Sequence, residues 1–240
     1  MMPGMLERLL LLAATLLIPV AIRMAFVLAP TEGKMGEVQR IFYFHVPSAE
    51  MAFLGVGLSA LFSVVYLYGR RRLVDVMAEA AAELGCLFCT IVLVTGPIWA
   101  RPIWGVWWTG EVRLTSTLVL WLILVGYLLL RQSAADREQA ARWGAIAAIV
   151  GALDMPIIYK SVEWWRGLHP KVLKISGGGG LDPVMGQALL VSSLAFLLLF
   201  AVLFMARVRL GLLEEEAESL ARAVDRRAAT AGGAPAGGVS

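Results

Sequence analysis

Six long apolar segments constrain the fold of this sequence more than any other feature. They cover residues 9–29, 46–69, 80–100, 114–130, 143–159 and 184–207. A helix needs about 20 mostly apolar residues to cross the hydrocarbon core of a bilayer. Only 16% of the chain is charged, against about 25% in soluble domains. The sequence therefore predicts an all-α, polytopic membrane protein with six transmembrane helices, the first of them retained because no convincing cleavage site follows it.

The number of spans decides which connections share a side of the membrane. An even number puts both termini on one side, with the short connections 70–77 and 131–142, and three longer connections on the other. Lysine and arginine are almost equally frequent on the two sides, so the positive-inside rule favours termini inside the cell only through the cluster at 70–72. We expect one membrane domain over residues 1–210. A cytoplasmic tail over 211–240 has a charged helical pattern to Arg227 and then a disordered end rich in Ala, Gly and Pro.

The connection at 102–116 reads P-I-W-G-V-W-W-T-G-E-V-R-L-T-S and carries Trp104, Trp107 and Trp108 within five residues. Indole rings favour the membrane interface because each has an apolar body and one N–H donor. A simple aromatic belt would scatter its rings among several helix ends. Here they are packed together beside two glycines, which predicts a flat apolar surface at one face of the membrane.

The two other long connections are amphipathic. Residues 31–44 place apolar side chains at near-helical spacing, and 160–183 interleave apolar and cationic residues around Trp164 and Trp165 before a run of four glycines. Such patterns are typical of short helices that lie on the bilayer surface. We expect both segments to flank the tryptophans on the same membrane face.

The chain contains two histidines, His45 and His169. Helix parity puts both on the side that carries the tryptophans. Neutral imidazole is the commonest metal ligand, and two imidazoles from separate segments can hold one haem iron axially. The alternative is that they are ordinary surface or helix-capping residues.

Other ionisable and polar residues have two interpretations each. Glu111 and Arg113 either pair with each other or bind the carboxylates of a ligand, and Arg113 with Arg101 or Arg166 would suit haem propionates. Asp154 lies within an apolar segment, where a carboxylate marks a functional site by default or makes a satisfied polar contact near Pro156.

The pair Cys86 and Cys89 forms C-x-x-C in the middle of an apolar segment. Thiols buried there without a neighbouring cation stay protonated and inert, so we interpret them as core residues and not as a redox pair. The net charge of +3 indicates no nucleic-acid partner.

Three of these segments resemble motifs of a known family. W-G-V-W-W-T-G-E-V-R-L-T-S at 104–116 resembles the tryptophan-rich signature of the haem-handling proteins of cytochrome c biogenesis. Its R-L-T-S ending is similar to the haem exporter protein C family of the system I maturation pathway. R-I-F-Y-F-H-V-P-S-A at 40–49 and S-V-E-W-W-R-G-L-H-P at 161–170 are similar to the two histidine segments of that family. The resemblance covers residues 9–207.

The resemblance implies a bacterial inner-membrane protein with both termini cytoplasmic and with the tryptophans and both histidines periplasmic. His45 and His169 would be axial ligands of haem b, carried as cargo, and Trp104, Trp107 and Trp108 would form its platform. The partners would be a periplasmic haem chaperone and the ATPase and membrane subunits of an ABC transporter, with a small accessory membrane subunit. The family usually reads W-x-W-D in its signature, whereas Gly110 stands here for the last tryptophan and Glu111 for the aspartate.

These observations predict a membrane protein that binds haem and presents it to the chaperone, and not an enzyme, because the sequence shows no Walker motif and no nucleophile–base pair. One alternative is an electron-transfer subunit of cytochrome b type, although such proteins hold their histidines deep in the spans. Another is a small-molecule permease that uses Asp154 and the prolines Pro19 and Pro156 as a broken-helix pathway.

Overall fold

The computed structural model describes residues 4–134, 136–165 and 181–232 of the chain. Within these ranges, six helices are long and apolar enough to cross a membrane. Their bounds are α1 Met5–Arg23, α2 Phe42–Gly69, α3 Arg72–Trp104, α4 Val112–Ser133, α5 Arg137–Trp164 and α6 Pro183–Gly232. The predicted all-α membrane fold with six spans is confirmed.

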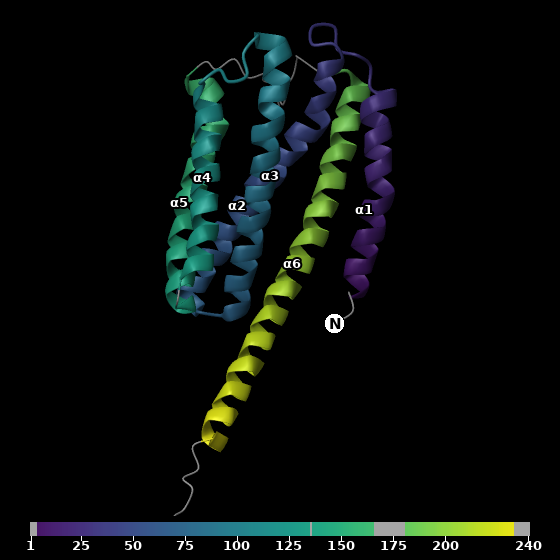
Figure 1. The fold of residues 1–240 in the computed structure, drawn as a ribbon. Helices are drawn as coiled ribbons and strands as arrows, with labels where there is room; N and C mark the ends of the chain where they lie inside the picture. Colours follow the sequence, from purple (N-terminus) through teal and green to yellow (C-terminus); the bar gives the residue numbers. More distant parts are fainter. Residues whose placement is uncertain (1–3, 135, 166–180, 233–240) are drawn as a thin grey trace, which may run out of the picture.

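The six helices run alternately up and down (Figure 1). Met5 and the C-terminal part of α6 lie toward the same end, which we call the terminal end. The other end, which we call the distal end, carries the start of α2, the connection between α3 and α4, and the start of α6. Helices α2 to α5 form a bundle, and α1 packs on α6 at its edge. The tryptophan-rich connection and His45 therefore share the distal end, as helix parity predicts.

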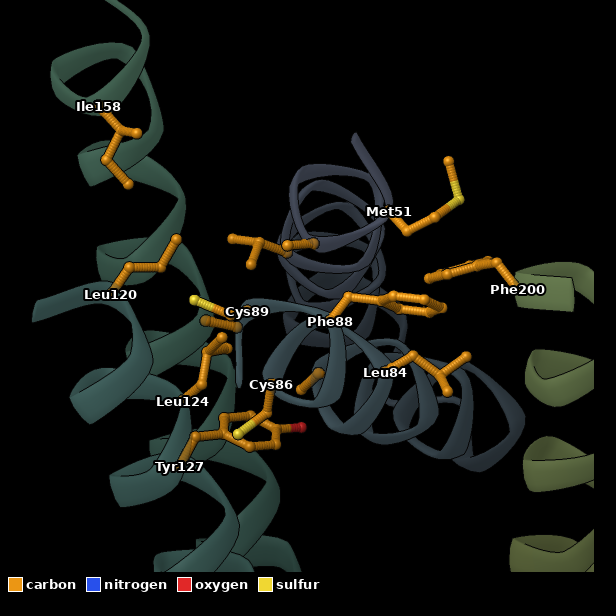
Figure 2. Packing of buried hydrophobic residues seen from close by; sticks show 14 residues of the cluster. Met51, Leu84, Cys86, Phe88, Cys89, Leu120, Leu124, Tyr127, Ile158 and Phe200 are labelled. Atoms are coloured by element: carbon orange, nitrogen blue, oxygen red, sulfur yellow. The ribbon is translucent and has the colours of Figure 1, made fainter. Parts of the chain in front are cut away.

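The centre of the bundle is a core of aliphatic and aromatic side chains from α2 to α6 (Figure 2). Phe88 of α3 stacks on Phe200 of α6 with ring centroids 6.0 Å apart. Cys86 and Cys89 are free and buried in this core, which agrees with their interpretation as packing residues.

Helices α2 and α3 approach most closely where two glycines meet. A Cβ atom added to Gly55 would lie 2.7 Å from the Cα atom of Gly85 and 2.9 Å from the carbonyl oxygen of Ala81. Small residues let helix backbones touch, and membrane helices use them in this way to pack. This crossing fixes the separation of α2 and α3.

Ion pairs join the helices toward the terminal end. The buried carboxylate of Asp75 in α3 accepts hydrogen bonds from the guanidinium of Arg131 in α4, at 2.5 Å and 3.1 Å. Arg131 also donates to Glu79, one turn along α3, at 2.6 Å. Among the described residues, five further pairs link separate helices or their connections: Arg70–Glu138, Arg72–Glu215, Arg137–Glu218, Arg207–Glu83 and Arg209–Glu7.

One segment differs in detail from the sequence-based expectation. Residues 31–44 contain a single 3-10 turn, Glu37–Ile41, which leads directly into α2 instead of forming a separate surface helix. Val38 and Ile41 pack against the buried cluster around Phe42, so this apolar face is turned into the protein. Helix α6 continues without a break past residue 210 through the charged segment to Arg227, for which the sequence predicts a helical pattern.

Candidate functional site

The tryptophan-rich connection is framed by two glycines in the left-handed conformation. Gly105 (φ +75°) follows the last residue of α3, Trp104, and its N–H donates to the carbonyl of Arg101 at 3.0 Å. Gly110 (φ +70°) precedes Glu111, the N-cap residue of α4. We had expected Trp104 outside the helix, but α3 extends past the apolar stretch until a glycine terminates it.

The indoles in this connection differ in their exposure. The side chains of Trp107 and Trp108 are 59% and 39% exposed, whereas Trp104 is partly buried. Exposed indoles beside the end of a membrane-spanning helix form an apolar surface at the interface. Their individual stacking roles remain a prediction.

His45 lies in the first turn of α2 and is buried, with only 6% of its surface exposed. Its imidazole packs against α3, where its Cε1 atom is 3.5 Å from the Cβ position of Gly96. The ring also meets the buried indole of Trp99 edge-on, with centroids 5.7 Å apart. The distance to Gly96 is an ordinary contact distance, so the imidazole packs against α3 at this glycine as well as against the indole of Trp99.

A hydrogen bond to Thr95 determines the tautomer of His45. The Nδ1 atom lies 2.8 Å from Oγ1 of Thr95, and this hydroxyl donates its single proton to the carbonyl of Ile91 at 2.7 Å. The hydroxyl must therefore accept from His45, so Nδ1 carries a proton, and in the neutral imidazole the basic lone pair is then on Nε2. A neutral imidazole whose other nitrogen donates to an oxygen is the usual state of a metal-ligating histidine.

Glu111 and Arg113 lie at the start of α4. The carbonyl of Glu111 accepts from the N–H of Thr115 at 3.1 Å. The guanidinium of Arg113 reaches α5, where Nε donates to the carbonyl of Ile158 at 3.2 Å and Nη2 to that of Tyr159 at 3.0 Å. Arg113 thus links the start of α4 to α5 near the tryptophan-rich connection. A contact between Arg113 and haem propionates stays a prediction.

The second predicted ligand, His169, lies outside the described residues, as do Arg166 and most of the amphipathic segment 160–183. The preceding residues are described: α5 ends at Trp164, and Trp164 and Trp165 are 60% and 56% exposed. Their rings meet edge-on, with centroids 5.6 Å apart. The chain thus enters this segment at the distal end with a second pair of exposed indoles.

Sequence reasoning missed the surroundings of His45. Thr95 and Trp99 are four residues apart on α3, so they share one face of that helix, and both contact His45. The available signal was a threonine and a tryptophan at helical spacing in an apolar segment. That signal shows that Thr95 and Trp99 share a face of α3, but it does not show which helix packs against that face.

The arrangement around His45 suits a metal-bearing ligand. It offers an imidazole with a protonated Nδ1, packed edge-on against the indole of Trp99 at the distal end of the bundle. The Nε1 atom of Trp99 is buried and has no hydrogen-bond partner among the described residues, so the indole beside His45 carries a donor that no described group accepts. Among the described residues, no cluster of three or more His, Cys, Asp or Glu side chains has the geometry of a metal-ion site.

The sequence is similar to one family over most of its length. The family model described as Heme exporter protein C matches residues 1–223. Heme exporter protein C of Bradyrhizobium diazoefficiens is 39% identical over 194 residues, covering 80% of this chain and 74% of the relative. The protein of the same name from Escherichia coli K12 is 37% identical over 77% of this chain and 74% of its own. That from Haemophilus influenzae is 33% identical over 90% of this chain and 88% of its own.

Proposed function

Since this chain belongs to the haem exporter protein C family, we propose that it binds haem b at the periplasmic surface of the bacterial inner membrane and presents it to a haem chaperone. The haem is cargo for later attachment to c-type cytochromes, and the protein performs coordination and transfer without a chemical reaction of its own. His45 and His169 supply the two axial imidazoles. Trp104, Trp107 and Trp108 cover the porphyrin.

The state of His45 is the observation that carries this proposal. The ring is buried between Gly96 and Trp99 and is held by Thr95 with Nε2 as its basic nitrogen. A histidine that only capped a helix or faced water would not need a buried acceptor for Nδ1. An imidazole that binds iron does, because that hydrogen bond orients the ring and raises its basicity.

The partners and orientation follow from the same proposal. Both termini are cytoplasmic, so the distal end faces the periplasm and the chaperone. An ABC transporter, made of ATPase and membrane subunits with a small accessory membrane subunit, uses ATP hydrolysis to release the loaded chaperone. In this proposal Arg113, with Glu111 beside it, binds the propionates of a haem on the tryptophan surface.

Absorption spectra of the purified protein, oxidised and reduced, test the proposal. We expect a bis-imidazole haem spectrum in the wild type that is lost in His45→Ala and in His169→Ala, although both variants still accumulate in the membrane. Both variants should also fail to load the purified chaperone with haem. Normal chaperone loading by both variants would contradict the proposal.

An electron-transfer role of cytochrome b type is the first alternative. Such a subunit holds haem near the middle of the membrane, whereas His45 is the fourth residue of α2. Quinone-linked turnover by the purified protein would favour this alternative, and its absence in protein that loads the chaperone would exclude it.

A permease is the second alternative, and Asp154 is the observation that favours it. The Oδ2 atom of this carboxylate in α5 is buried without a hydrogen-bond partner among the described residues, two residues before Pro156. Haem-independent solute transport in vesicles that is lost in Asp154→Asn would support a permease.

A further inference from the structure

Thr95 controls which nitrogen of His45 is offered to a ligand. We propose that Thr95 is the positioning residue of the haem site, because it accepts the Nδ1 proton of His45 and so directs Nε2 to the iron. This inference rests on the proposed function, in which His45 binds haem. Thr95 itself does not touch the haem.

The direction of the hydrogen bonds makes Thr95 an obligatory acceptor. A hydroxyl has one proton, and that of Thr95 is given to the carbonyl of Ile91, one turn back along α3, at 2.7 Å. The oxygen lone pair then faces Nδ1 of His45 at 2.8 Å. If His45 carried its proton on Nε2, two lone pairs would face each other at this distance in a buried site, where an unsatisfied polar contact is costly.

The packing adds a second constraint on the same ring. Gly96 leaves room for the imidazole edge, and Trp99 closes the site one turn beyond Thr95. The hydrogen bond to Thr95 and the contact with Trp99, one turn apart on α3, thus set the rotation of the ring as well as the tautomer of its neutral form. Ligand geometry that is set by supporting residues in this way is typical of metal sites, and its loss lowers metal affinity about 10- to 100-fold.

Helix α3 provides a matched control for this threonine. Thr90 has the same pattern of bonds: its hydroxyl donates to the carbonyl of Cys86 at 2.8 Å and accepts from Nε1 of Trp121 at 2.8 Å. Thr90→Val therefore removes the same kind of hydrogen bond from the same helix. It leaves His45 untouched.

The first measurement is made without haem. With 15N-labelled histidine, the His169→Ala protein has His45 as its single histidine, so the nitrogen chemical shifts report its tautomer directly. We expect a protonated Nδ1 in this background and with Thr95→Ser or Thr90→Val added. Thr95→Val should move the proton to Nε2, and an unchanged Nδ1–H signal in Thr95→Val would overturn the inference.

The second measurement is haem titration of protein that retains both histidines. We expect Thr95→Val to weaken haem binding about 10- to 100-fold and to change the ligand-field bands of the bound haem. Thr95→Ser and Thr90→Val should bind haem as the wild type does. Equal affinity in Thr95→Val would overturn the positioning role even if the tautomer changes.

The two experiments separate the failure of this inference from the failure of the proposed function. Wild-type protein that binds no haem refutes the proposed function, and the positioning role falls with it. Wild-type protein that binds haem, beside a Thr95→Val variant with unchanged tautomer and affinity, refutes the positioning role alone.

Discussion

The glycine crossing of α2 and α3 should tolerate no side chain at Gly55. In Gly55→Ala the new Cβ would meet backbone atoms of Gly85 at 2.7 Å, whereas ordinary contacts begin at 3.4 Å. The difference between these distances means that the helices must separate by about 0.7 Å. A gap of that size loses about a quarter to a half of the dispersion energy of each nearby contact. We expect a loss of stability of about 1–3 kcal/mol, the usual cost of overpacking.

Gly57→Ala is the matched control, because nothing lies within 4 Å of its Cβ position. Both substitutions gain about 0.5–1 kcal/mol from the better helix propensity of alanine. The difference between the two variants therefore isolates the packing cost. It is measured by titrating each protein in detergent micelles with sodium dodecyl sulfate and following the loss of helical circular dichroism.

The same substitution should also weaken haem binding. Gly55 lies ten residues after His45, and Gly85 lies ten residues before Thr95, so the crossing is about 15 Å from the imidazole along both helices. Separation of the helices there lengthens the hydrogen bond between His45 and Thr95. A Gly55→Ala protein as stable as Gly57→Ala, with unchanged haem affinity, would refute this reasoning.

Three further substitutions test other parts of the structure. Arg131→Met removes one of the two arginine partners of the buried Asp75 carboxylate and leaves Arg72 as the other. It should cost about 1–3 kcal/mol, measured by the same denaturant titration, and the double variant Arg131→Met/Asp75→Leu should recover part of that loss. Gly110→Ala places a side chain at φ +70° and should cost about 1–2 kcal/mol. Gly126→Ala, in an open helical position, is the comparison and should gain about 0.5–1 kcal/mol. Arg113→Met removes two hydrogen bonds to α5 and should lower stability by about 1–3 kcal/mol; an additional fall in haem affinity that Arg113→Lys partly restores would support a contact with the propionates.

The spans were predictable from the sequence because the bilayer imposes a length on any helix that crosses it. The same constraint, with an even number of spans, correctly placed His45 and the tryptophans at one end of the bundle. The ends of the helices were predicted less accurately. Helix α3 begins before residue 80 and ends after residue 100, because its bounds are set by capping residues that need not coincide with the limits of the apolar stretch.

The surroundings of His45 could not be predicted in the same way. Periodicity places Thr95 and Trp99 on one face of α3, but the rotation of α3 against α2 depends on the crossing at Gly55 and Gly85, far away in the sequence. The direction of the Thr95 hydroxyl also depends on a backbone carbonyl that no side-chain pattern reveals. The contacts of His45 with Thr95 and Trp99 depend on tertiary packing. His45 itself could be singled out because the chain has only two histidines.

Because of the ion pairs near the terminal end, the two ends of the bundle are held together by different kinds of contact. Among the described residues, every salt bridge that joins separate helices lies toward that end, whereas the distal end is held by apolar and aromatic contacts and single hydrogen bonds. Breaking a buried ion pair is costly, and the pair of Arg131 and Asp75 is buried on both sides. We therefore expect any tilting of the helices to displace the distal end more than the terminal end.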